Sequence, residues 1–175
     1  GYVYSGKTAA HAYNLLLGKK FKTVVVISPS HSEYFPGICV FEGDAYETPL
    51  GLLKIDKEFR EKLVTNDNVI FKGYEGHRRE HALEVQLPFL QSVLQDFKIV
   101  PVVMGDQSKR NIDALAKKLA ELADDETLIV ASSDLSHFYS KSQADKLDSV
   151  VEKRVREFDF DSLQFDLENH ACEAC

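Results

Sequence analysis

The most constraining feature of this sequence is an apolar run, Thr23-Val24-Val25-Val26-Ile27, that leads directly into Ser28-Pro29-Ser30-His31. A continuous β-branched run that ends in polar residues and proline predicts a strand buried on both faces. Such strands belong to parallel sheets covered by helices, and ligands bind beyond their carboxyl ends. Because Pro29 lacks a backbone donor, we expect the hydrogen-bond ladder to stop there. Ser30 and His31 are therefore expected to lie where a ligand would bind. The alternative is that His31 is a structural histidine of the loop.

The rest of the chain alternates helical and extended patterns. Residues 1–6 are expected to form a loop, in which Ser5 caps a helix that runs to Leu17. Extended segments are predicted at residues 38–41, 48–55, 69–71, 99–104 and 127–131. Helices are predicted at residues 57–64, 80–94, 108–122, 143–158 and 161–168, with a kink at Pro88 and with Val155 facing inward. This alternation indicates an α/β fold with a largely parallel or mixed central sheet flanked by helices.

Composition narrows the class of protein. The chain has 28 acidic against 21 basic residues and a net charge of −7, which argues against a general nucleic-acid binder. No apolar run approaches the roughly 20 residues needed to span a bilayer, so no membrane segment is expected. The three cysteines, Cys39, Cys172 and Cys175, do not form the pattern of a disulfide framework, which favours a reducing cytoplasm.

A second polar cluster follows the extended segment at residues 127–131. Its sequence is Ser132-Ser133-Asp134-Leu135-Ser136-His137. If the two strands are parallel neighbours, this cluster and His31 lie in one crevice. Asp134 and His137 share a face if a helical turn starts there, and a nearby carboxylate raises the basicity of a histidine for acid/base chemistry. The alternative is that Asp134 caps a turn and His137 is a surface residue.

Two further groups are ambiguous from spacing alone. Glu80, His81 and Glu84 lie at the predicted start of a helix, where they are either site residues or a solvated, capped helix start. They lack the second histidine of a His-Glu-x-x-His zinc motif. Cys172 and Cys175 form a single Cys-x-x-Cys pair, which indicates zinc only weakly because no second pair is present.

Taken together and in order, the motifs resemble one family. They are Gly1-Tyr2-Val3-Tyr4-Ser5-Gly6, Ser28-Pro29-Ser30-His31, Glu80-His81-Ala82-Leu83-Glu84-Val85-Gln86-Leu87-Pro88-Phe89-Leu90, Ser132-Ser133-Asp134-Leu135-Ser136-His137 and a final Ala174-Cys175. The set resembles the MEMO family, the mediators of ErbB2-driven cell motility and their prokaryotic relatives called AmmeMemoRadiSam system protein B. The resemblance implies one domain over residues 1–175, truncated at both ends, with a fold similar to class III extradiol dioxygenases.

The resemblance also implies roles for individual residues. By position, His31 and Cys175 match metal ligands of the family, with Cys172 as the register alternative, and a further histidine ligand is expected upstream of Gly1. Asp134 and His137 match pocket residues, and His137 is similar in place to the acid/base histidine of the dioxygenases. The remaining pocket positions implied by the resemblance are Tyr2, Ser30, Glu80 and His81. Ser32 replaces a second histidine that some members carry.

Three functions follow from this resemblance. The first is a metal-binding, copper- or iron-dependent redox protein with a His/His/Cys-type pocket that also holds a small molecule or peptide; zinc is a third choice of metal. The second is a non-haem Fe(II) extradiol dioxygenase acting on a catechol, but a thiolate ligand softens the site and makes ring cleavage less natural. The third is a non-enzymatic phosphopeptide-binding module, which fits an acidic chain less well.

Overall fold

The computed structural model describes residues 1–174, which form two compact units. The first unit, Gly1–Ser132, contains most of the regular elements. They are α1 (Tyr2–Asn14), β1 (Thr23–Pro29), β2 (Ile38–Phe41), β3 (Ala45–Thr48), β4 (Gly51–Lys54), α2 (Lys57–Leu63), β5 (Ile70–Gly73), η1 (Glu84–Gln86), α3 (Leu87–Val93), β6 (Lys98–Met104), α4 (Lys109–Leu122) and β7 (Thr127–Ala131). The second unit begins at Ser133 and contains α5 (Lys141–Glu157) and α6 (Phe160–Glu168).

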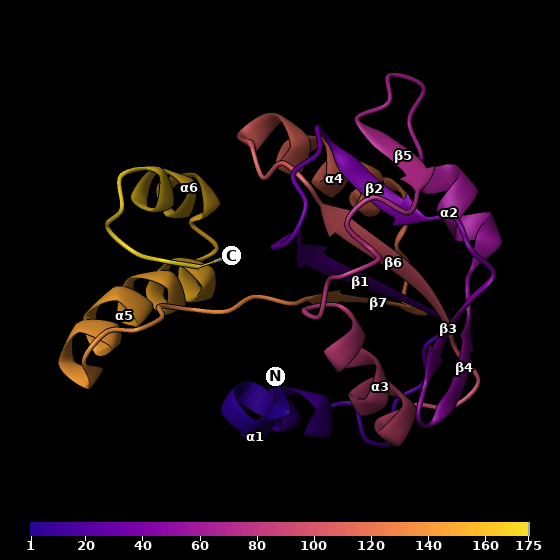
Figure 1. Ribbon diagram of the computed structural model, residues 1–175, viewed down its shortest axis with the longest axis horizontal. Coiled ribbons are helices and arrows are strands. Elements are labelled where there is room, and N and C mark those ends of the chain that lie inside the picture. The colour runs from indigo at the N-terminus through magenta and orange to yellow at the C-terminus, as the bar shows by residue number, and fades with distance from the viewer. Residues whose placement is uncertain (175) are drawn as a thin grey trace. The chain divides into compact units, whose positions relative to one another are not determined.

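The central sheet of the first unit has the strand order β5-β2-β6-β1-β7 (Figure 1). Strands β6 and β7 both run parallel to β1, with Thr23 opposite Lys98 on one side and Thr127 on the other. Strand β2 is parallel to β5 but antiparallel to β6. The predicted α/β fold with a largely parallel or mixed sheet is therefore confirmed.

Strand β1 is buried on both faces, as its sequence predicts. Val24 and Val26 contribute to one apolar core, together with Tyr13 of α1 and residues of α3 and of the β3–β4 hairpin. Val25 contributes to a second core on the other face, where α2 and α4 supply Leu63 and other residues. Alternate side chains of a strand point to opposite faces, so one continuous apolar run serves both cores.

The N-terminal helix differs from its prediction. The structure has no loop over residues 1–6, because α1 begins at Tyr2, where the Gly1 carbonyl oxygen accepts hydrogen bonds from the Tyr4 and Ser5 amides. Ser5 is thus inside the first turn and does not cap the helix. The Tyr2 ring packs edge-on against Phe89, with ring centroids 5.6 Å apart. Contact with α3 stabilises a turn that local sequence alone does not indicate.

Two other predictions were wrong in detail. Residues 48–55 do not form one extended segment, because β3 and β4 pair as a hairpin, and Gly51 takes the left-handed conformation at φ 117° after the turn. The helix predicted at residues 80–94 is replaced by the short 3₁₀ turn η1 and the helix α3. Pro88 lies in the first turn of α3, where its missing N–H has no partner to lose, so it starts this helix and does not kink it.

The second unit is a pair of packed helices. Helix α5 begins at Lys141 because Ser140 and Gln143 form a capping box at its N-terminus. Arg154 of α5 forms ion pairs with Asp159 and with Asp166 of α6, both at 2.8 Å. Val155 was expected to face inward, but half of its surface is exposed. No helix within residues 1–174 is long and apolar enough to cross a bilayer.

Candidate functional site

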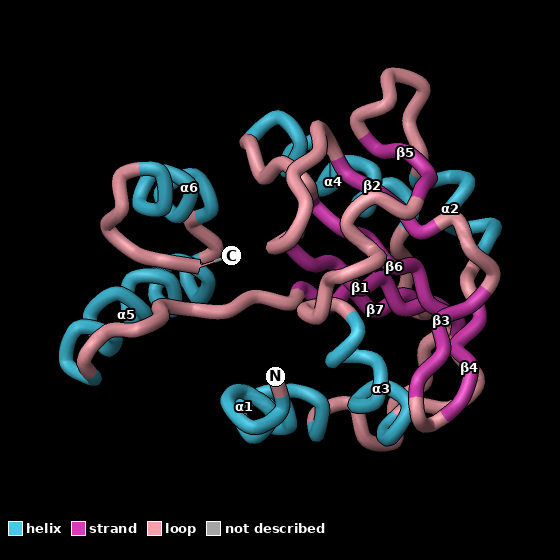
Figure 2. Tube along the Cα trace, viewed as in Figure 1, coloured by secondary structure: helices cyan, strands magenta, loops and turns pink. Residues whose placement is uncertain are grey.

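His31 lies in the loop after β1, Glu80 lies in the loop before η1, and the two residues contact each other. Loops are drawn in pink in Figure 2. One oxygen of Glu80, Oε2, accepts a hydrogen bond from the His31 amide at 2.7 Å, and the other, Oε1, lies 3.0 Å from Nδ1 of the His31 ring. The Glu80 side chain is only 3% exposed, whereas the His31 side chain is 52% exposed. A buried carboxylate therefore holds His31 by two contacts, one to its backbone amide and one to its accessible ring.

Glu80 is ionised when it makes these contacts. Burial opposes its ionisation, but the amides of His31 and Ala82 and the His31 ring outweigh burial and hold the pKa of Glu80 below its ordinary value. A carboxylate only accepts hydrogen bonds, so Nδ1 of His31 carries the hydrogen, and in a neutral ring the lone pair is on Nε2. Glu80 does not open a helix as predicted, because its side chain takes the Ala82 amide at 2.8 Å and the backbone there remains a loop.

A chain of hydrogen bonds supports the Glu80 loop from behind. The Ser132 hydroxyl donates to the Ala82 carbonyl at 2.8 Å, and the Gln86 side-chain amide donates to the Ser132 hydroxyl at the same distance. The Tyr13 hydroxyl donates to Oε1 of Gln86 at 2.7 Å. Gln86 was not predicted as a site residue, although its place in the Glu80–Leu90 motif was a usable signal. The network connects α1, η1 and the residue after β7 to the loop that contains Glu80, the residue that contacts His31.

The other predicted pocket residues of the first unit are exposed or make only local contacts. His81 contacts Glu84 at 2.7 Å, and the His81 side chain is 81% exposed, which is the geometry of a solvated surface pair. The Ser30 hydroxyl donates to the Glu33 carbonyl at 2.5 Å within the loop after β1. Tyr2 is half exposed beside Phe89. Their roles in a pocket stay predictions.

In the second unit, His137 lies between two carboxylates. Its Nε2 is 3.1 Å from Oδ2 of Asp134, and its Nδ1 is 3.6 Å from Oε1 of Glu173. The His137 amide also donates to that Glu173 oxygen at 3.3 Å. The predicted Asp134–His137 contact is present, but it forms in an irregular segment and not on a helical turn. Glu173 was not predicted, and its only sequence signal was its place between the two C-terminal cysteines.

These residues lie in sequence motifs that can be compared with known proteins. The family model described as Memo-like protein matches residues 1–175. The chain belongs to the Memo-like family. Among its relatives, a MEMO1 family protein of Methanobrevibacter smithii is 39% identical over 163 residues, which cover 91% of this chain and 58% of the relative.

Further relatives of this Memo-like chain come from other archaea. A MEMO1 family protein of Thermoplasma volcanium is 35% identical over 100% of this chain and 65% of its own length. One of Nitrosopumilus maritimus is 33% identical over 100% of this chain and 64% of its own length. The Memo-like chain therefore spans 58–65% of the length of these curated relatives.

The structure describes only some of the expected metal ligands of the Memo-like chain. Cys175 lies outside the described residues. Cys172 is buried, and burial raises the pKa of its thiol. Within residues 1–174, no three His, Cys, Asp or Glu side chains are grouped as a complete metal site. The expectation that His137 and Asp134 share a crevice with His31 stays a prediction.

Proposed function

We propose that this Memo-like protein holds one transition-metal ion, copper, iron or zinc, with His31 and Cys175 among its ligands. The observation that carries the proposal is the contact between His31 and the buried carboxylate of Glu80. A metal-binding histidine usually donates its other ring N–H to a carboxylate, which fixes the tautomer and raises the basicity of the ligating nitrogen. Glu80 provides this arrangement for Nε2 of His31.

The donor set suits a soft or borderline metal. Imidazole with thiolate fits zinc, copper or iron better than the hard, oxygen-rich site of a ring-cleaving dioxygenase. A bound copper or iron ion would supply a redox centre, and zinc a Lewis acid. Of the chain's own groups, Glu80 would orient the His31 ring, and His137, which contacts Asp134 and Glu173, would hold or pass a proton. A small molecule or peptide is the expected occupant of the pocket.

Cys175 is a better candidate ligand than Cys172. Metals bind the thiolate, and burial of a thiol opposes its deprotonation. Cys172 is only 4% exposed, and burial is the main cause of its raised pKa. Recruiting Cys172 would require the surrounding packing to open. We therefore assign the thiolate ligand to Cys175 in this proposal.

Exchange of single cysteines tests the proposal. We expect Cys175→Ser to weaken metal binding by at least about tenfold, because a hydroxyl is a poor ligand for a soft ion. Cys172→Ser is the matched control and should bind within about twofold of the unaltered protein. The measurement is metal content by mass spectrometry after purification without added metal, followed by competition with a chelator. Equal metal content in all three proteins would contradict the assignment, and a loss confined to Cys172→Ser would reverse it.

A dioxygenase activity is the second candidate, favoured by the position of His137 beside two carboxylates. Such a histidine can act as an acid or base toward a bound catechol. We expect that anaerobic loading with Fe(II), followed by catechol and air, gives no yellow ring-cleavage product. The check is the visible absorbance of the reaction mixture. Strong absorbance that disappears in His137→Gln would favour the dioxygenase over the redox protein.

A further inference from the structure

A cavity lies at the amino end of β1, opposite the end that leads to His31. Its volume is about 460 Å³, within the size range of small-molecule sites. Three segments of the first unit form it: the loop before β1, the end of α3 with the turn that follows it, and the residue before β7. Its charged lining residues are Lys19, Lys20, Lys22, Asp96 and Glu126.

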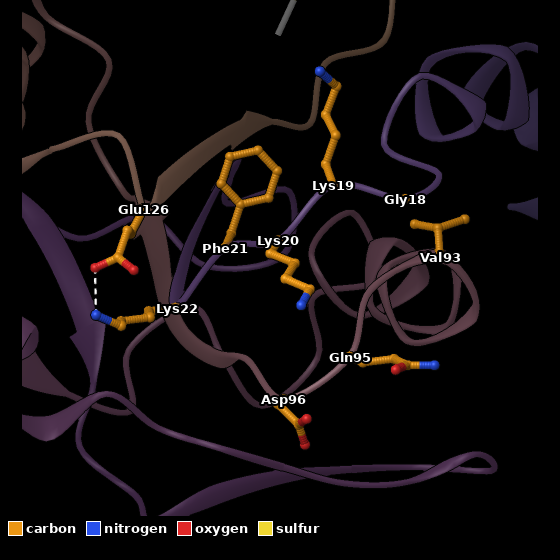
Figure 3. A pocket seen from close by; sticks show the side chains of 9 residues that line it. All are labelled: Gly18, Lys19, Lys20, Phe21, Lys22, Val93, Gln95, Asp96 and Glu126. Atoms are coloured by element: carbon orange, nitrogen blue, oxygen red, sulfur yellow. Dashed lines mark hydrogen bonds and ion pairs between the residues drawn. The ribbon is translucent and has the colours of Figure 1, made fainter.

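The charged side chains that line this cavity differ in their pairing and in their direction. Lys22 and Glu126 satisfy each other in a direct ion pair (Figure 3). In Figure 3 the side chain of Lys19 points away from Lys20, Gln95 and Asp96. Within residues 1–174, no side-chain hydrogen bond or ion pair joins Lys20 or Asp96 to a protein group. One cation and one anion thus line the same cavity without pairing with each other.

Other groups line the cavity beside these charges. Gln95, next to Asp96 in sequence, contributes an amide, and Phe21 and Val93 contribute apolar surface. Asp96 adopts a left-handed conformation at φ 54°, which aspartate tolerates better than most residues and which sets the direction of its side chain. A ligand that carries both an ammonium and a carboxylate would satisfy Lys20 and Asp96 at once.

We infer that this cavity binds a free α-amino acid with an apolar side chain. The ligand carboxylate is held by Lys20, its ammonium by Asp96, and its side chain lies against the apolar part of the lining. The charges are exposed to solvent and partly screened, so we expect weak binding, with a dissociation constant on the order of 0.1–1 mM at low salt. The site is independent of the proposed metal pocket, because it lies at the other end of β1.

The test is a titration of the full chain with L-leucine, followed by amide NMR shifts of the three lining segments. N-acetyl-leucine lacks the ammonium and leucine amide lacks the carboxylate, and each should bind at least about tenfold more weakly. The result that supports the inference is saturable shifts with leucine alone. Absence of saturable shifts with leucine would overturn it. Equal binding of N-acetyl-leucine would also overturn it and would identify a simple anion site.

Variants assign the two charges. Lys20→Gln and Asp96→Asn should each weaken leucine binding about tenfold or more, because each removes one charged contact. Lys19→Gln is the matched control and should bind leucine within about twofold of the unaltered chain. Leucine binding retained in both variants would overturn the inference. So would tighter binding in Asp96→Asn, or an equal loss in Lys19→Gln, which would indicate a diffuse positive surface.

Discussion

His31→Ala is expected to abolish stoichiometric metal binding by the full chain. The substitution removes the imidazole that Glu80 orients, and residues 30–37 of the same loop carry no second histidine and no cysteine. The fold should survive, because the His31 side chain is half exposed and Glu80 keeps two amide hydrogen bonds, from His31 and Ala82. The measurements are metal content and thermal unfolding. Stoichiometric metal in a folded His31→Ala protein would rule out this ligand.

Glu80→Gln separates the ligand from its support. Glutamine keeps the size of the side chain but removes its charge, so the orientation and basicity of His31 are weakened while the imidazole remains. Loss of a supporting group of this kind typically lowers metal affinity by about 10–100-fold. We expect Glu80→Gln to bind metal measurably but more weakly, between the unaltered protein and His31→Ala. Affinity unchanged in Glu80→Gln would leave the buried carboxylate with a structural role only.

The stability of the first unit is expected to fall by about 2 kcal/mol between pH 7 and pH 5 because of His77. The ring is partly buried beside Tyr46 and strand β2. Its Nδ1 lies 2.7 Å from the Tyr46 hydroxyl, and its Nε2 lies 3.3 Å from the Cys39 carbonyl, which only accepts. The neutral ring satisfies both partners, with the hydrogen on Nε2. Burial lowers the pKa of His77 to about 4.

The sign follows from comparing the two states. In the unfolded chain His77 has its ordinary pKa of 6.5, so below that pH the unfolded chain binds a proton more readily than the folded protein. The contribution to stability is fully present above about pH 6.5 and is lost as the pH falls toward about 4. The whole difference corresponds to roughly 3 kcal/mol at 1.36 kcal/mol per pKa unit.

Urea unfolding at pH 7, 6 and 5 measures this effect. His77→Gln should show a flatter pH dependence, whereas His81→Gln, which alters an exposed ring, should follow the unaltered protein. If His77→Gln does not fold, the NMR titration of the His77 ring in the unaltered protein gives the same information. A ring that titrates near 6.5 in the folded protein would contradict the prediction.

Local patterns predicted the elements whose burial is simple. The apolar run of β1 requires burial on both faces of the strand, and the 3.6-residue period of α4 requires burial of one helix face. In the structure Val25 of β1 and Leu115 of α4 are both buried in the same core. Asp56, directly before the predicted helix at residues 57–64, caps α2 by accepting a hydrogen bond from the Phe59 amide at 3.1 Å. These signals involve residues that are close in sequence, so they do not depend on how the rest of the chain folds.

The wrong predictions share a different cause. The helix α1 includes Tyr2 because that ring meets Phe89, far away in the sequence, and Glu80 stays in a loop because it reaches His31 across 49 residues. Spacing around Glu80 indicated a helix start, and nothing local shows that its carboxylate is buried. Contacts of this kind outweigh intrinsic propensities of less than about 1 kcal/mol per residue.

By itself, the sequence determined the α/β class, the buried strand that leads to His31, and, through its ordered motifs, membership of the Memo-like family. Only the tertiary structure decided which polar residues face each other: Glu80 beside His31, Gln86 beside Ser132, and Glu173 beside His137. The reason is physical. Burial of apolar residues follows a local period, whereas a hydrogen bond between distant loops depends on how the whole chain brings them together.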